Sequence, residues 1–316
     1  MKYNMKLVMI NDCSGVGETL LKYLPGDIEK QHIERTRGFW SKTFGVAYRI
    51  LKSNGDIYHS NYLLQDCYIA IRLGKKPVVG WSLGSDIRTG LKHPIWARIV
   101  RHNLKNCSKV LVSTPDILDS AKKYRDDAQY FPPAIDMEFY FFKPLIEHER
   151  KKVLIASNVN WSVKGTNVAV RALSMLKKET EVSIIQYGSD FEKTLSLASS
   201  LDLPLRVLPP ASHEQMREYY WNADIVLDQF VCGCAGMVSL EAIACGRPVV
   251  TYVTSEYDEY EDFPLKDVIT EDQIAAATIQ AGNDLWKRQY EYLKKKHEAT
   301  SVVKKLLAIY GSLSNK

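Results

Sequence analysis

The sequence lacks the patterns of a membrane span or a metal centre. It has no run of about 20 apolar residues, which a bilayer-spanning helix requires. The uncharged stretch from Gln229 to Leu240 is short and is interrupted by glycine and serine. Six cysteines are scattered without a C-x-x-C pair, and no two aspartates stand as D-x-D. The sequence therefore predicts no transmembrane helix and no metal.

The rest of the composition is that of an ordinary globular protein. Hydrophobic residues make up 46% and charged residues 25% of the chain, without low-complexity tracts or short repeats. A chain of 316 residues exceeds the size at which one core stops growing, so we expect two domains. The apolar segment Met5–Ile10 is too short for a signal peptide and predicts a buried strand. With its cysteines reduced, the protein is expected to be cytoplasmic.

Charge is unevenly distributed along the chain. Residues 1–143 carry a net charge of +8 and residues 144–316 a net charge of −3. A basic front half could attract an anionic lipid surface, as a peripheral membrane contact, or a phosphorylated acceptor. No nucleic-acid reader motif is present, so no nucleic-acid partner is expected. The best candidate for a membrane-facing basic helix combines cations and apolar residues near helical spacing: Arg98, Arg101, Lys105 and Lys109 beside Trp96, Ile99, Val100 and Leu104. An ordinary surface helix would have the same pattern.

Short strands alternate with helices, which predicts parallel, doubly wound sheets of the α/β class. In the front half the expected strands are 7–10, 56–59, 77–80 and 109–113, with helices at 16–24, 40–51, 62–73, 94–106 and 115–124. The helix from Trp40 is expected to bury Phe44, Ala47, Tyr48 and Leu51. In the back half the expected strands are 153–156, 182–187, 205–208, 225–228 and 248–252, with helices at 166–177, 192–200, 214–221 and 238–244, and helices again beyond residue 271.

A proline-rich segment without periodicity, residues 131–144, predicts a linker. We expect domains at residues 1–140 and 141–285, followed by C-terminal helices at 286–316. These last helices pack back on the first domain or, alternatively, on another subunit. Because ligands bind at the carboxyl ends of parallel strands, two such sheets would face a cleft.

The segment Gly233–Val250 carries the clearest chemical signal. Gly233 and Gly236 allow backbone amides to approach a ligand, and the helix that follows presents free donors and a positive dipole end. Glu241 stands a little over one turn into that helix, where a carboxylate can accept from two hydroxyls. The pattern suits a phosphate next to a diol, as in a nucleotide sugar. An ordinary loop, helix and strand would share these residue types.

Four blocks in order resemble the retaining GT-B glycosyltransferases of family 4, which consist of two Rossmann-like domains. They are Lys164-Gly165-Thr166, the block Gly233–Val250, the linker residues Ile135-Asp136 with Phe139 and Lys143-Pro144, and Gly84-Ser85-Asp86-Ile87-Arg88. The resemblance implies transfer of a sugar, with retention and without a metal or other cofactor, from a UDP- or GDP-linked donor to a hydroxyl. That acceptor would be a glycan or a lipid-linked molecule, in glycan, glycolipid or polysaccharide biosynthesis.

The resemblance also implies roles for individual residues. Lys164 would bind the diphosphate, and Glu241 the ribose diol. Backbone donors to phosphate and sugar would come from the glycine loop and the start of its helix, at Gly233, Gly236, Met237 and Val238. Gly15 and Gly17, after the first strand, would form the front-domain turn that approaches the donor, although many such turns are merely tight.

Three further positions have two interpretations each. Asp86 would orient an acceptor or sugar hydroxyl, or it caps the next segment. His213 would lie near the nucleotide base, or it caps the helix that begins at Glu214. Gly188 ends a strand beside that loop and would admit the base.

The sequence departs from the family pattern at three positions. Gly233 replaces the first of two glutamates eight residues apart, Asn158 replaces a frequent arginine, and Leu83 replaces a histidine. These changes favour an alternative, a non-catalytic subunit that binds a nucleotide sugar or glycan. A nucleotide-sugar epimerase of the same architecture is a further alternative, but it would need an acid–base pair that the sequence does not offer.

Overall fold

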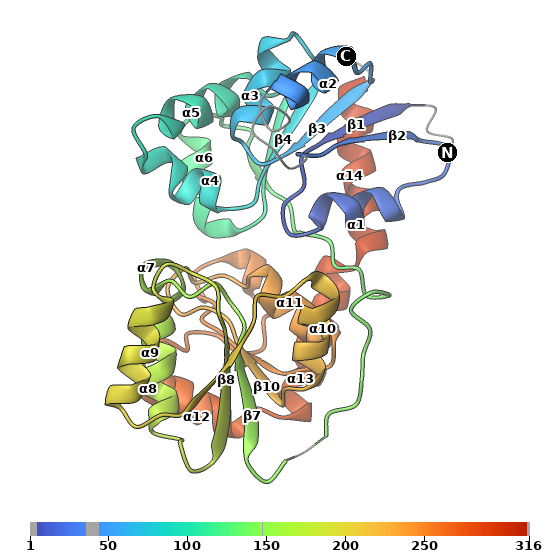
Figure 1. The fold of residues 1–316 in the computed structure, drawn as a ribbon. Coiled ribbons are helices and arrows are strands. Elements are labelled where there is room, and N and C mark those ends of the chain that lie inside the picture. Colours follow the sequence, from blue (N-terminus) through green and yellow to red (C-terminus); the bar gives the residue numbers. More distant parts are fainter. Residues whose placement is uncertain (1–4, 36–43, 147, 315–316) are drawn as a thin grey trace. The chain divides into compact units, whose positions relative to one another are not determined.

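The computed structural model describes residues 5–35, 44–146 and 148–314 (Figure 1). The chain divides into two compact units. Unit 1 comprises Met1–Ala134 and His297–Lys316, and unit 2 comprises Ile135–Lys296. The two ends of the chain therefore belong to the same unit, and each unit is built around one parallel sheet.

Unit 1 has a six-stranded parallel sheet in the order β2-β1-β3-β4-β5-β6. Its strands are β1 (Lys6–Ile10), β2 (Glu29–Ile33), β3 (Ile57–Asn61), β4 (Val78–Ser82), β5 (Lys109–Val112) and β6 (Gln129–Tyr130). Its helices are α1 (Val16–Tyr23), α2 (Val46–Lys52), α3 (Gln65–Arg72), α4 (Ser85–Arg88), α5 (Trp96–Asn106), α6 (Leu118–Lys122) and α14 (Ala299–Ser314).

Helices cover both faces of this sheet. The apolar core on one face joins β1 and β3 to α2, α3, α5 and α6 through residues such as Val8, Ile50 and Val100. Tyr58 belongs to this core, so the next residue, His59, points to the opposite face. There His59 Nδ1 lies 2.7 Å from the hydroxyl of Tyr310 on α14, and α14 packs against α1. The C-terminal helix thus covers this face of the sheet of unit 1, as Figure 1 also shows.

Helix α2 corrects the expected burial of this region. Residues 40–43 of the expected helix lie outside the described ranges. In the described part, Val46 and Ile50 are buried, while Phe44, Tyr48 and Leu51 are 64%, 60% and 53% exposed. The helix has apolar residues on both faces, so periodicity alone selected the wrong one.

Unit 2 has a five-stranded parallel sheet in the order β11-β10-β7-β8-β9. Its strands are β7 (Lys151–Ile155), β8 (Thr180–Ile185), β9 (Leu205–Leu208), β10 (Ile225–Leu227) and β11 (Val249–Val250). Its helices are α7 (Trp161–Lys164), α8 (Thr166–Ser174), α9 (Phe191–Ser200), α10 (His213–Trp221), α11 (Met237–Ala244), α12 (Glu271–Gln280) and α13 (Asn283–His297). One core packs the sheet against α8, α9 and α12, and the other against α10, α11 and α13 (Figure 1).

The strand order creates a switch point between β7 and β10. From β7 the chain builds outward to β8 and β9, then returns to add β10 and β11 on the other side. The loops that follow β7 and β10 therefore leave the sheet in opposite directions, and the space between them is where ligands bind in such sheets. At this point the Ser157 hydroxyl, after β7, donates to the carbonyl of Asp228, after β10, at 2.6 Å.

Candidate active site

Helix α11 begins at the end of the loop that follows β10. Gly236 is the N-cap residue of this eight-residue helix and has no side chain to accept from the first-turn amides. Met237 and Val238 are partly exposed there, and Ser239 is buried. Gly233 precedes the helix with a left-handed backbone, φ 64°. The sequence-predicted glycine loop and helix start are therefore both present, with amides that an anion could contact.

Gly236 is required by a neighbouring side chain. A Cβ atom at this position would lie 2.7 Å from Oδ2 of Asp228, which is too close for any real contact. The same Oδ2 accepts a 2.7 Å hydrogen bond from the hydroxyl of Ser239. Asp228 thus lies directly against the first turn of α11.

Lys164 reaches the same carboxylate from the loop after β7. It is the last residue of α7, and Gly165 separates it from α8. Its Nζ donates to Oε1 of Gln229 at 2.6 Å and lies 3.7 Å from Oδ1 of Asp228. Because Asp228 contacts both Lys164 and the first turn of α11, the structure brings the predicted cation and the predicted anion-binding helix start together.

Glu241 lies one turn further along α11 and is 5% exposed. Burial raises the pKa of this carboxyl to about 7, although hydrogen bonds from Tyr220 and Tyr140 lower it. The Tyr220 hydroxyl donates to Oε2 at 2.8 Å. The carboxylate has further acceptor capacity for hydroxyl groups of a ligand.

His213 is connected to Glu241 through one side chain. The Tyr140 hydroxyl, which bonds to Glu241, lies 3.0 Å from Nδ1 of His213. His213 is exposed and is the first residue of α10. The alternative that His213 caps this helix is wrong, because Ser212 is the N-cap and forms a capping box with Gln215.

Gly188 follows β8 with φ 135°, a backbone conformation that favours glycine. A Cβ atom here would lie 2.3 Å from the carbonyl oxygen of Val159 and 2.5 Å from Oδ1 of Asn158. The Val159 amide in turn donates to the carbonyl of Tyr187 at 2.7 Å. The close approach of the loop after β7 is therefore enough to require glycine at this position.

The glycine turn in unit 1 also serves its own structure. Gly15 is the N-cap of α1 and adopts a left-handed conformation. The amides of Gly17 and Glu18 donate to the Asp12 carboxylate at 3.1 and 2.8 Å. A Cβ atom at Gly17 would lie 2.7 Å from Nδ2 of Asn61. Asp12, which the sequence did not single out, already accepts from first-turn amides of this helix.

Asp86 is buried in unit 1, with 2% of its surface exposed. Its Oδ1 accepts from the Ser82 hydroxyl at 2.6 Å and from the Gly84 amide at 3.2 Å, and its Oδ2 accepts from the Leu63 amide at 2.8 Å. Burial raises the pKa of this carboxyl, and these hydrogen bonds lower it. The contacts join the turn after β4 to the loop after β3.

The sequence-predicted residues thus fall into two groups. Those of unit 2 gather around α11 and the switch point. Gly15, Gly17 and Asp86 lie in unit 1. Four residues of the site were not predicted from the sequence: Asp228, Gln229, Tyr140 and Tyr220. Two polar residues directly after the buried strand β10 were the available signal for the first pair, whereas only the tertiary fold identifies the tyrosines.

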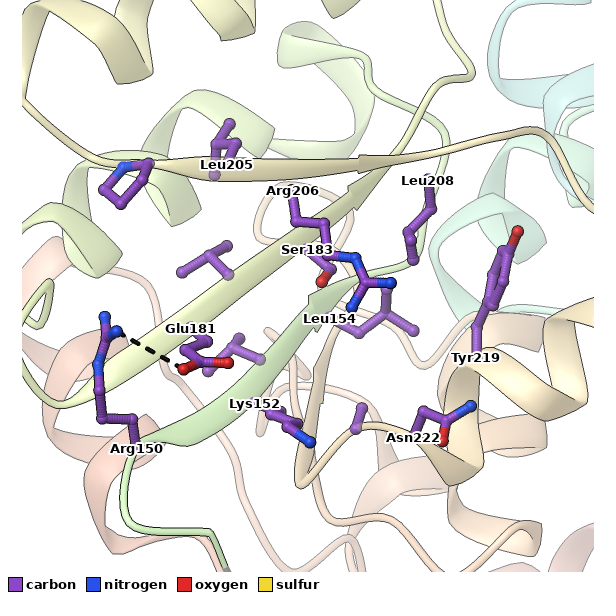
Figure 2. A pocket seen from close by; sticks show the side chains of 14 residues that line it. Arg150, Lys152, Leu154, Glu181, Ser183, Leu205, Arg206, Leu208, Tyr219 and Asn222 are labelled. Carbon is purple, nitrogen blue, oxygen red and sulfur yellow. Dashed lines mark ion pairs between the residues drawn. The ribbon is translucent and has the colours of Figure 1, made fainter.

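A cavity of about 650 Å³ lies elsewhere in unit 2, on the face of the sheet formed by β7, β8 and β9. Figure 2 shows Arg206 reaching over this face toward Ser183 and Leu154, with Tyr219 and Asn222 at one side. None of the sequence-predicted site residues lines it. The cavity and the cluster around α11 are therefore separate features.

Among residues 5–35, 44–146 and 148–314, no group of three His, Cys, Asp or Glu side chains is placed to hold a metal ion. Within the same ranges, no helix has both the length and the apolar character needed to cross a membrane.

Comparison with known proteins gives one family and many structural neighbours. The family model described as "Glycosyl transferases group 1" matches residues 136–298. D-inositol 3-phosphate glycosyltransferase of Arthrobacter sp. (strain FB24) is 24% identical over an alignment of 164 residues, and the match covers 45% of this chain and 39% of that protein. N-acetyl-alpha-D-glucosaminyl L-malate synthase of Bacillus anthracis is 26% identical over an alignment of 227 residues, and the match covers 66% of this chain and 59% of that protein.

The structural matches extend over nearly the whole chain. Anabaena Alr3699/HepE in complex with UDP and glucose has a TM-score of 0.75 at 12% identity, covering 98% of this chain and 100% of that one. Sucrose-phosphate synthase from Thermosynechococcus elongatus has a TM-score of 0.72 at 13% identity, covering 98% and 99%. At these identities the likeness shows the fold.

Proposed function

The chain belongs to the glycosyl transferases group 1 family, and from this membership we propose that it transfers a sugar from a nucleotide diphosphate sugar to an acceptor hydroxyl. Its two parallel-sheet units have the GT-B fold, as the resemblance implied. We also propose that the protein is a family 4 hexosyltransferase, which acts with retention of the anomeric configuration and without a metal.

One observation carries the proposal. The Asp228 carboxylate contacts both Lys164 and the first turn of α11, so a partly exposed ammonium and a set of helix amides lie at one point of the sheet. A diphosphate matches both, because the ammonium supplies a charge-assisted hydrogen bond and the helix start supplies amides and a positive dipole end. On departure of the sugar, the same groups would stabilise charge on the leaving diphosphate.

Glu241 and His213 extend this site for the rest of a nucleotide. We assign the ribose diol to Glu241, since its ionised carboxylate can accept from two hydroxyls in addition to the two tyrosines. The base would lie near His213, which Tyr140 connects to Glu241. The structural neighbour with bound UDP and glucose supports a uridine nucleotide. GDP is the other candidate.

The test is incubation of the protein with a panel of UDP- and GDP-linked sugars and with hydroxyl acceptors, both glycans and lipid-linked molecules. Mass spectrometry of the products and calorimetry with UDP and GDP are the readouts. Transfer to an acceptor with the anomeric configuration of the donor retained supports the proposal. Absence of binding by every nucleotide diphosphate would contradict it.

A non-catalytic binding subunit is the second candidate. It is favoured by Gly233 and Asn158, which stand where the family pattern has an acid and a second cation. Under this alternative the panel would yield binding of a nucleotide sugar without hydrolysis or transfer. Since the chain spans 39% and 59% of the two curated relatives, their acceptors do not carry over to it.

A further inference from the structure

Asp228 is an acid in a place where water cannot reach it. It follows the buried strand β10, is 2% exposed and lies under the first turn of α11. Its Oδ2 accepts from the Ser239 hydroxyl at 2.7 Å. Its Oδ1 is buried without a hydrogen-bond donor among the described residues. A carboxylate left half satisfied in the interior is costly unless a cation compensates it.

Lys164 supplies the compensating charge, but only loosely. Its Nζ lies 3.7 Å from the unsatisfied Oδ1, beyond hydrogen-bond distance, while it donates to Gln229 at 2.6 Å. The lysine side chain is 23% exposed, whereas the Asp228 side chain is fully buried. The ammonium can therefore move toward a ligand, and the carboxylate cannot follow it.

Resting on the proposed function, we propose that Asp228 is the counter-ion of Lys164 while the donor site is unoccupied, and that a bound diphosphate replaces it in this role. Asp228 is then a positioning residue. It keeps the ammonium beside the start of α11, and its fixed negative charge opposes the diphosphate that the lysine attracts. The opposition lowers the affinity for a nucleoside diphosphate and so favours its release after transfer.

The position of Gly236 supports a built-in role for this carboxylate. A Cβ at Gly236 would meet Oδ2 at 2.7 Å, so the glycine of the loop and the acid beneath it fit each other. Ser239, in the same turn, donates to the same oxygen. The fold thus fixes the acid from the helix side and leaves its other oxygen toward the lysine.

The experiment compares Asp228→Asn with Ser239→Ala by calorimetry with UDP, GDP, uridine and guanosine. Both variants alter the contact between Asp228 and Ser239, but only Asp228→Asn removes the charge. We expect Asp228→Asn to bind the preferred nucleoside diphosphate about fivefold more tightly than wild type. Its affinity for the nucleoside alone should be unchanged, and Ser239→Ala should not bind the diphosphate more tightly.

The outcomes separate this inference from the proposed function. Equal or weaker diphosphate binding by Asp228→Asn, or the same gain in Ser239→Ala, would overturn the counter-ion role. If wild type binds neither diphosphate, the proposed function itself fails. Asp228→Ser, a second neutral and smaller polar variant, replaces Asp228→Asn if the latter does not fold.

Discussion

Opposing effects act on the carboxyl of Glu241. Burial favours the neutral acid and raises the pKa, while the phenols of Tyr220 and Tyr140 favour the anion and lower it. The balance is a pKa of about 7. Near neutral pH the residue is therefore divided between two forms, and only the anion offers its full acceptor capacity to a ribose diol.

Glu241→Gln tests this balance through stability. Because the folded-state pKa is raised above the unfolded value of 4.5, the folded state binds the proton more tightly. Wild type therefore loses stability as pH rises from about 4.5 to about 7, and Glu241→Gln lacks this loss. Between pH 5 and pH 8 the variant should gain up to about 3 kcal/mol relative to wild type, measured by urea unfolding. Parallel pH profiles for the two proteins would rule out the raised pKa.

Lys164→Ala tests the diphosphate assignment. Loss of a group that stabilises charge on the leaving group should lower turnover about a hundredfold. Because Lys164 compensates the buried Asp228 carboxylate, its removal also lowers stability, so circular dichroism at the assay temperature must show a folded variant before the two turnovers are compared. Lys193→Ala, on an exposed position of α9, is the matched control and should keep wild-type turnover. Wild-type transfer by Lys164→Ala would refute the role.

Residue types identified only part of the site. Lys164, Gly236 and Glu241 could be named from spacing and resemblance, because backbone geometry and a required charge leave local marks in a sequence. Tyr140 lies 101 positions before Glu241, so no local pattern connects them. Asp12 was missed for a related reason. An aspartate directly after a strand looks the same in the sequence whether it binds a ligand or accepts hydrogen bonds from the first turn of the next helix.

At the scale of elements, Arg247 connects the segment before β7 to the end of α10. This arginine is 2% exposed. It donates to the carbonyls of Tyr220 and Trp221 in the last turn of α10 and to that of Lys143. A cation at a helix C-terminus also matches the negative end of its dipole. The hydrogen bond to Tyr220 is buried and those to Trp221 and Lys143 are partly buried, so the guanidinium satisfies backbone acceptors that have little access to water.

Arg247→Met should destabilise the protein by about 3 kcal/mol, because these buried and partly buried carbonyls would lose their donor. The measurement is the unfolding midpoint in urea. Arg171→Met is the control, since Arg171 is 46% exposed and only 3.8 Å from the equally exposed Glu271. That variant should differ little from wild type. An equal loss in both variants would show that Arg247 has no special structural role.

The elements that sequence reasoning found are those with a strong apolar pattern. Strand β9 has the bounds predicted for it, Leu205–Leu208. Strand β2, Glu29–Ile33, was missed because Ile33 is its only apolar residue, so its sequence shows neither an apolar run nor an alternation. Lys109 was counted among the cations of the basic segment and also as the first residue of a strand, and the strand is confirmed, because α5 ends at Asn106 and β5 begins at Lys109.

At the scale of the whole molecule, charge is divided as the sequence indicated. The net charge of residues 1–143 is +8, that of residues 144–316 is −3 and the isoelectric point is about 8.7. On α5, Arg98, Arg101 and Lys105 are exposed, while the apolar side chains Val100 and Leu104 are buried in the core of unit 1. The helix thus presents cations on its outer face. Ile95, just before it, is 65% exposed.

This arrangement supports a peripheral contact with anionic lipid, because each cation near such a surface contributes about 1 kcal/mol and the attraction is screened by salt. We expect the protein to float with vesicles that contain phosphatidylserine at low salt, and less so at high salt or with neutral vesicles. Exchanging Arg98, Arg101 and Lys105 for glutamine should abolish flotation. The matched control exchanges three exposed cations of unit 2, Lys193, Lys287 and Arg288. If both triple variants lose flotation equally, net charge governs binding and α5 is a plain surface helix.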